Sequence, residues 1–221
     1  MRILSLFVGL AFCAMAQAAT PNPMLEGFTE VDAKRVDKAW VLPGAEFGAY
    51  TKVMIDPVQV AFRKNWLRDV NRSGGGARIN QKDAEEIAAA GREGFDAIFA
   101  DTFRKAGYEV TMQAGADVLR LSPSISDVYI DAPAKLTEFG NQIYSVEAGE
   151  AVLVLAVSDS PTGAVLGVAM DRREAGDHGG TVSRMDWRTK ASNRADFERM
   201  FRSWAKDSVD GLNDLKAGEA K

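Results

Sequence analysis

The sequence predicts an α+β protein, a two-layer sandwich in which a mixed sheet of about four strands packs against two long helices. Two segments, about 81–106 and from Asn193 onward, place apolar residues at three- and four-residue steps, which is typical of helices. Shorter runs rich in β-branched and apolar residues are typical of strands. These runs cover 51–62, 115–132, 150–159 and 163–174. The predicted order is therefore strand, helix, strand, strand, strand, helix (β-α-β-β-β-α).

The first two predicted strands each contain a proline, Pro57 and Pro123. Proline cannot donate to a strand ladder, so each one indicates an edge position or a bulge. An exposed edge strand of this kind could accept a strand from a partner protein. The third predicted strand, at 150–159, is apolar at nearly every position, which predicts that it is covered on both faces.

The helices are marked by their flanking residues. Asn80 can cap the first helix, and Asn193 with Asp196 provides capping groups for the last one. The glycines at 74–76 are not followed by Gly-Lys-Ser/Thr, so they predict an ordinary loop and not a phosphate cradle. The long glycine-rich connection at 174–193 has a length that is often functional in proteins.

The stretch DSPTG at 159–163 joins the last two strands, and it has two interpretations. Asp159, Pro161, Thr162 and Gly163 have the composition of a tight turn, because proline presets φ and glycine permits a positive φ. The serines in and beside this stretch could instead be nucleophiles, which need a general base that is usually a histidine. The chain contains one histidine, His178. We therefore expect a structural turn and no catalytic residue.

Residues 1–18 have the pattern of a signal peptide. Arg2 precedes an apolar run, and Ala16-Gln17-Ala18 matches the small-x-small pattern that signal peptidase accepts. We therefore expect a cleaved leader and a periplasmic location. The single cysteine, Cys13, lies in the apolar run, and Phe12 stands where a lipidation signal has a small residue. We expect no lipid anchor at Cys13.

After the leader, we expect an irregular aromatic lead-in at 19–49, a single α+β domain at 50–216 and a frayed tail at 217–221. Trp204 falls on the apolar stripe of the last helix and is expected in the core. Three other large aromatic residues stand in or beside predicted loops and are candidate interaction residues. These are Tyr50, Trp66 and Trp187.

Composition and motifs exclude several functions. The formal net charge of −4 gives no electrostatic footprint for nucleic acid. The sequence contains no HExxH motif, no EF-hand loop and no cysteine pair, so we expect no metal site and no cofactor. Beyond residue 20, no apolar stretch approaches membrane-spanning length, which leaves only a peripheral association with a membrane.

Three stretches resemble an uncharacterised bacterial family, the domain of unknown function numbered 3313. They are KAWVLPGAEFGAYTKVMIDPVQVAF, GADVLRLSPSISDVYI and GEAVLVLAVSDSPTGAVLGVAMDRR. The resemblance spans roughly residues 37–215, and its most specific parts are Tyr50 to Val58 and the Asp-Ser-x-Thr-Gly pattern at 159–163. It implies an exported or lipid-anchored envelope protein. The predicted strand order is also similar to that of small envelope modules that act through their surfaces, although a fold alone does not define a function.

The sequence favours a non-catalytic periplasmic or cell-envelope protein that acts as a binding or assembly module, with a protein partner in the envelope. Two alternatives stay open. The first is a binder of a small apolar or cell-wall ligand, which requires a cavity between the sheet and the helices. The second is a hydrolase that uses carboxylate or metal chemistry. The identity of the partner and the oligomeric state are left open by the sequence.

Overall fold

A computed structural model describes residues 25–73, 78–130, 144–145, 149–176, 186–187 and 190–218. The predicted leader, Cys13, the glycines at 74–76, His178 and most of the 174–193 connection lie outside the described residues. In chain order the elements are β1 (Thr29–Val31), β2 (Lys38–Val41), β3 (Lys52–Ile55), β4 (Gln59–Phe62), α1 (Trp66–Ser73), α2 (Gln81–Lys105), β5 (Glu109–Val110), β6 (Val118–Ile130), β7 (Tyr144–Ser145), β8 (Gly149–Asp159), β9 (Val165–Ala175), β10 (Asp186–Trp187) and α4 (Lys190–Ala217).

The α+β class is confirmed, but the sheet is larger than predicted. Eight strands form one mixed sheet in the order β1-β2-β9-β8-β6-β3-β5, with β4 also paired to β6. The prediction of about four strands was wrong because it missed the short strands. Two of them, β1 and β2, lie in the lead-in at 19–49, which is therefore not irregular throughout. The strands β7 and β10 form a separate two-stranded pair.

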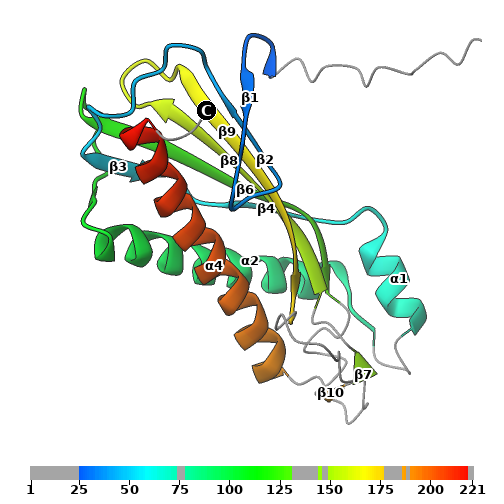
Figure 1. Ribbon diagram of the computed structural model, residues 1–221. Helices are drawn as coiled ribbons and strands as arrows, with labels where there is room; N and C mark the ends of the chain where they lie inside the picture. The colour runs from blue at the N-terminus through cyan, green and yellow to red at the C-terminus, as the bar shows by residue number, and fades with distance from the viewer. Residues whose placement is uncertain are drawn as a thin grey trace, which may run out of the picture.

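Both long helices pack on one face of the sheet (Figure 1). Their aromatic side chains meet the inner face of the strands, and Phe95 packs edge-on against Phe201 with ring centroids 5.4 Å apart. Phe47 of the predicted lead-in and Tyr50 at the start of the predicted domain belong to this same core. A large part of the stabilising free energy comes from burial of this apolar surface.

The opposite face of the sheet is not covered by the two long helices. Val154 pairs with Met170, and Ala156 pairs with Val168, which in turn pairs with Trp40. All of these point away from the core, and most are partly exposed. The prediction that the strand at 150–159 is covered on both faces was therefore wrong for the described residues.

Pro57 lies at the break between β3 and β4, beyond which β4 pairs only with β6, whereas Pro123 lies in an interior strand beside that break. The predicted strand at 51–62 is interrupted around Pro57 and forms β3 and β4, both parallel to β6. Pro123 lies in the central strand β6, between β8 and the β3 and β4 pair. Leu121 O accepts from Asp56 N at 2.9 Å, so the nitrogen of Pro123, two residues on, faces the same side, where neither β3 nor β4 continues. The expected edge strand with Pro123 is therefore absent from this sheet.

A bulge in β6 changes which residues face the core. The register with β8 shifts between Ser126 and Tyr129, and Asp127 has a positive φ of 54°. As a result Val128 points into the core with Ile125, whereas strict alternation along the strand would place these two residues on opposite faces. Asp127 is held by Arg63 at 3.0 Å and by Arg172 at 2.8 Å, and both arginines also bind Glu150.

The bulge contributes to stability in a pH-dependent way. The hydrogen bond from Arg63, supported by Arg172, holds the pKa of Asp127 below its ordinary value. A carboxyl group with a lowered pKa in the folded state stabilises the protein above its unfolded-state pKa, and this contribution is lost as pH falls from about 5 through about 4 and below. Asp127→Asn keeps a residue that tolerates positive φ. We expect the variant to lose less free energy of unfolding than the wild type between neutral pH and about pH 3, measured by urea denaturation at each pH. An equal decrease of the free energy of unfolding with falling pH in the variant and the wild type would contradict this role.

The helices largely follow their sequence signals. Asn80 caps α2, and its side chain and that of Asp83 form a reciprocal capping box. The last helix, in contrast, begins at Lys190, so Asn193 and Asp196 lie inside it and not at its cap. The short helix α1 was not predicted, because its main anchor is distant in the sequence: Trp66 donates through Nε1 to Ile130 O at 3.1 Å.

Candidate functional site

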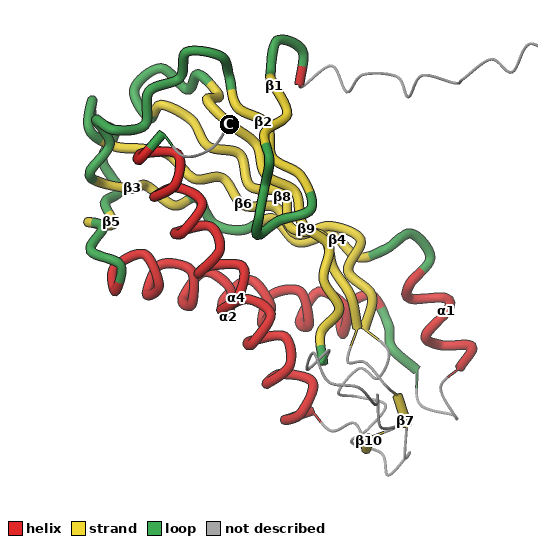
Figure 2. The backbone as a smooth tube through the Cα atoms, in the orientation of Figure 1, coloured by secondary structure: helices red, strands yellow, loops and turns green. Residues whose placement is uncertain are grey.

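An apolar cavity of about 130 Å³ lies between the inner face of the sheet and α4, beneath the loop that joins β1 to β2. Figure 2 shows this loop beside α4, in front of the long strands. The walls come from segments that are far apart in the sequence. Phe47, Phe103, Leu121, Leu153, Leu155, Val157, Trp204 and Leu212 are among the apolar lining residues.

The cavity arises because several positions along its walls carry small residues, which leave space unfilled. Ala39 pairs with Ala169, and Val41 pairs with Gly167, so β2 and β9 present little bulk to the inner face. Across from them, α4 contributes Gly211 between larger side chains. Voids of this size are few in protein interiors, which are otherwise close-packed.

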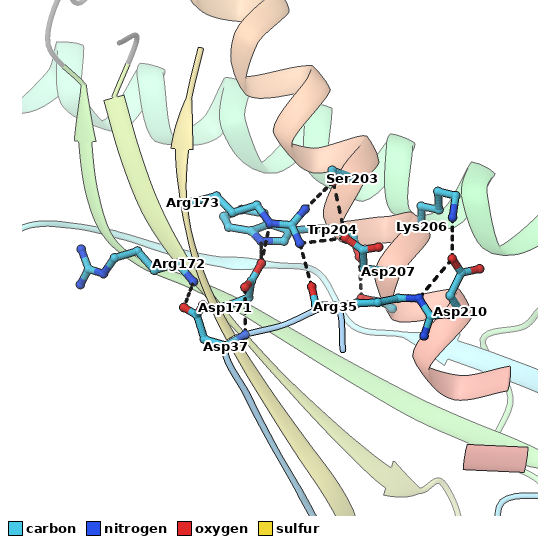
Figure 3. A network of polar contacts seen from close by, with 11 residues as sticks. Arg35, Asp37, Asp171, Arg172, Arg173, Ser203, Trp204, Lys206, Asp207 and Asp210 are labelled. Carbon is cyan, nitrogen blue, oxygen red and sulfur yellow. Dashed lines mark hydrogen bonds and ion pairs between the residues drawn. The ribbon is translucent and has the colours of Figure 1, made fainter. Parts of the chain in front are cut away.

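A polar network borders the cavity at Asp171 (Figure 3). Its carboxylate accepts hydrogen bonds from Trp204 Nε1 at 2.8 Å and from the backbone nitrogen of Asp37 at 3.1 Å, and Arg173 Nε lies 2.5 Å away. Arg173 also bonds Asp207 at 2.8 Å. Asp171 is only 5% exposed, so these partners provide the compensation that a buried carboxylate requires.

The loop above the cavity is attached to β9 through Asp37 and through Arg35 O, which accepts from Arg173 at 3.1 Å, and secondly to α4 through the side chain of Arg35. Asp37 is fixed to β9, because its backbone nitrogen donates to Asp171 and its carboxylate accepts from Arg172 N at 2.9 Å. Arg35 reaches α4, where it bonds Asp214 and lies 3.7 Å from Asp210. The hydrogen bond to Asp214 raises the pKa of Arg35, so this side chain stays charged. The second attachment is solvent-exposed and therefore weak.

The predicted turn at 159–163 is present. Gly163 has a φ of 72°, its nitrogen donates to Asp159 O at 2.8 Å, and the Asp159 side chain accepts from Thr162 N at 3.0 Å. Hydrogen bonding by Thr162 lowers the pKa of Asp159. The residues of this turn satisfy one another, as in a local structural motif.

The three candidate interaction residues are placed differently. Tyr50 belongs to the core and donates through its hydroxyl to Asp159 at 3.1 Å; burial, followed by this bond, raises its pKa. Trp66 is 1% exposed and donates to Ile130 O at 3.1 Å, so its ring is not available at the surface. Trp187 belongs to β10, which pairs with β7. The structure does not bring these three residues into one site.

The sequence did not single out the residues around the cavity. Trp204 was expected in the core and is 1% exposed, but its partner Asp171 was not noticed. One signal was available: Asp171 is in phase with Gly167 and Ala169, on the face of a strand that should be buried. A carboxylate at such a position implies buried polar partners.

Neither a metal centre nor a membrane-spanning helix is found in the part of the chain that the structure describes. No group of three or more histidine, cysteine, aspartate or glutamate residues there is arranged to hold a metal ion. Within the same described ranges, no helix combines the length and the apolar character that crossing a bilayer requires.

The fold and the cavity define an α+β sandwich protein with an apolar cavity beneath its last helix. A family model described as protein of unknown function (DUF3313) matches residues 17–208. The chain belongs to this family, as the resemblance of its sequence predicted. A comparison with curated proteins found no significant sequence relative.

Solved structures with a related fold share little sequence with this chain. A PelC dodecamer from Paraburkholderia phytofirmans is 14% identical, with 79% of this chain and 97% of that chain covered and a TM-score of 0.38. A Xanthomonas campestris protein of the family DUF330 is 11% identical, covers 80% and 91%, and has a TM-score of 0.43. A Helicobacter pylori protein described as a neuraminyllactose-binding hemagglutinin homolog is 10% identical, covers 77% and 88%, and has a TM-score of 0.31. No function follows from so distant a likeness.

Proposed function

We propose that this chain is an exported, non-catalytic binding module and that its ligand site is the cavity between the sheet and α4. The observation that carries this proposal is an apolar hollow of about 130 Å³ inside an otherwise packed core. A dry apolar cavity of about 150 Å³ in another protein binds benzene. The cavity here is therefore large enough for a ring or a short hydrocarbon chain.

Export and the lack of a catalytic role rest on the sequence. The leader pattern at 1–18 supports secretion into the periplasm, with removal of Cys13 and no lipid anchor. A chain with one histidine and one cysteine offers few groups that could activate a nucleophile. The charged residues beside the cavity support the same conclusion, since Asp171 and Arg173 are engaged in the structural network.

A second candidate function is assembly with a protein partner in the envelope. It is favoured by the uncovered face of the sheet, where Trp40, Val154 and Met170 form an apolar strip. Partly exposed apolar residues that lie together on a surface are typical of protein contacts. The cavity is the stronger candidate because most of its wall is apolar, and concave, mostly apolar sites are where small ligands usually bind.

Binding of the fluorescent probe N-phenyl-1-naphthylamine, whose phenyl ring has the size that the cavity can hold, tests the leading proposal. We expect saturable binding to the purified protein, and we expect Ala169→Phe to weaken it at least about tenfold, because the new ring fills the cavity. The matched control is Ala156→Phe on the neighbouring strand, whose side chain points to the opposite face. Circular dichroism should show both variants folded. No saturable binding by the wild type, or equal weakening by both variants, would overturn the cavity proposal and favour the uncovered face.

A further inference from the structure

Gly211 in α4 has no explanation in the folding of the helix. A glycine inside a helix costs about 1 kcal/mol relative to alanine. Such a glycine is usually retained for a positive φ or for the close approach of another segment. Gly211 has neither reason: no positive φ is found there, and a Cβ added to it would meet no atom within 4 Å.

Gly211 lies on the wall of the cavity, which explains why no atom lies close to it. Trp204, Ser208, Gly211 and Leu215 follow one another at steps of four, three and four residues, so they share one face of α4. All four line the cavity. A side chain at position 211 would therefore extend toward the space that the ligand is proposed to occupy.

The polar groups around the cavity restrict what can enter it. Trp204 lines the cavity, and its Nε1 donates to Asp171. Asp171 is bonded in turn to Arg173 and to the backbone of Asp37. The wall formed by Phe103, Leu121 and Leu153 carries no polar side chain, so a ligand hydroxyl or amide buried against it would lose its bonds to water without gaining a partner, which is costly. The buried part of the ligand should therefore contain no polar atoms.

We propose that Gly211 determines the size of ligand that the cavity accepts, and that the buried part of this ligand is an unsubstituted hydrocarbon group of about six carbon atoms. This inference rests on the proposed function of the cavity. A leucine at position 211 would add four carbon atoms, which would occupy most of the 130 Å³. An alanine would add one and leave most of the space free.

The test uses the same probe and its displacement by straight-chain 1-alkanols from butanol to decanol. We expect hexanol and longer alcohols to displace the probe from the wild type, Gly211→Ala to bind within about threefold of the wild type, and Gly211→Leu to bind at least about tenfold more weakly. The matched controls are Gly91→Ala and Gly91→Leu in α2, where an added Cβ also meets no atom within 4 Å but where the residue does not line the cavity. These controls should leave the binding unchanged.

The outcomes separate this inference from the proposed function. If the wild type binds the probe and Gly211→Leu binds it equally well while remaining folded, the role of Gly211 is wrong and the cavity proposal stands. If a diol of the same length displaces the probe as well as the alcohol does, the requirement for a hydrocarbon group is wrong. If the wild type binds nothing, both proposals fail. Thermal unfolding followed by circular dichroism establishes that each variant is folded.

Discussion

Replacing Asp171 with alanine should lower the free energy of unfolding by about 3 kcal/mol, because it leaves Arg173 with only Asp207 as an ion-pair partner and removes a buried acceptor from two nitrogen donors. The carboxylate of Asp171 satisfies Arg173, the indole nitrogen of Trp204 and the backbone nitrogen of Asp37. Alanine would leave all three without this acceptor. The change should appear as a lower midpoint of urea denaturation with an unchanged slope.

Two comparisons make the effect of Asp171 specific. Asp171→Asn keeps the size of the side chain and one oxygen acceptor, so it should cost less than the alanine variant. Ser203→Ala removes a hydroxyl that meets Arg173 at the exposed side of the network and should have little effect. A loss below about 1 kcal/mol in Asp171→Ala would show that the network contributes little to the fold.

Among substitutions that add a single methyl group to a glycine in the described strands, Gly149→Ala should lower the free energy of unfolding most. Gly149 pairs with Ile130 at the start of β8 and has a φ of 152°. A Cβ there would lie 2.0 Å from Tyr129 O, and backbone atoms cannot move aside as a flexible side chain can. Overpacking costs about 1–3 kcal/mol, and an unfavourable φ about as much again, so we expect a loss of about 2–5 kcal/mol.

The control for Gly149 is Gly163→Ala in the hairpin turn. Gly163 also has a positive φ, 72°, but a Cβ there meets no atom within 4 Å. This variant should therefore show only the conformational cost of about 1–2 kcal/mol. Thermal and urea denaturation of the two variants separate the steric effect from the conformational one. Equal losses would mean that the strand pair between β6 and β8 relaxes enough to admit the methyl group.

The elements that could be predicted from the sequence are those whose signals are local. The capping box at Asn80 and the turn at 159–163 depend on residues within a few positions of one another, and both are present. The strands β1 and β2 have only three and four residues, and their pairing depends on β9, more than a hundred residues away. Short strands with charged residues give no clear alternation, so the sheet was predicted with too few strands.

The candidate site could not be predicted from the sequence for a related reason. A cavity is a space between segments, and its walls here come from the lead-in, the strands β6, β8 and β9, and the helices α2 and α4. Gly211 and Ala169 carry no chemical signal in the sequence, because glycine and alanine occur in many unrelated contexts. The sequence predicted only that an apolar ligand would require a space between the two layers, and the structure contains such a space.

The two prolines at the break in the sheet, Pro57 and Pro123, help to fix the register of the parallel strands. On one side β6 pairs with β8 over most of its length, apart from the bulge between Ser126 and Tyr129. On the other side Pro123 stands between the residues that pair with β3 and those that pair with β4, where the neighbouring chain departs at Pro57. If β3 or β4 shifted along β6, one of its backbone carbonyls would face the nitrogen of Pro123, which carries no hydrogen. Such wrong alignments are therefore penalised, and one register of the parallel strands is favoured.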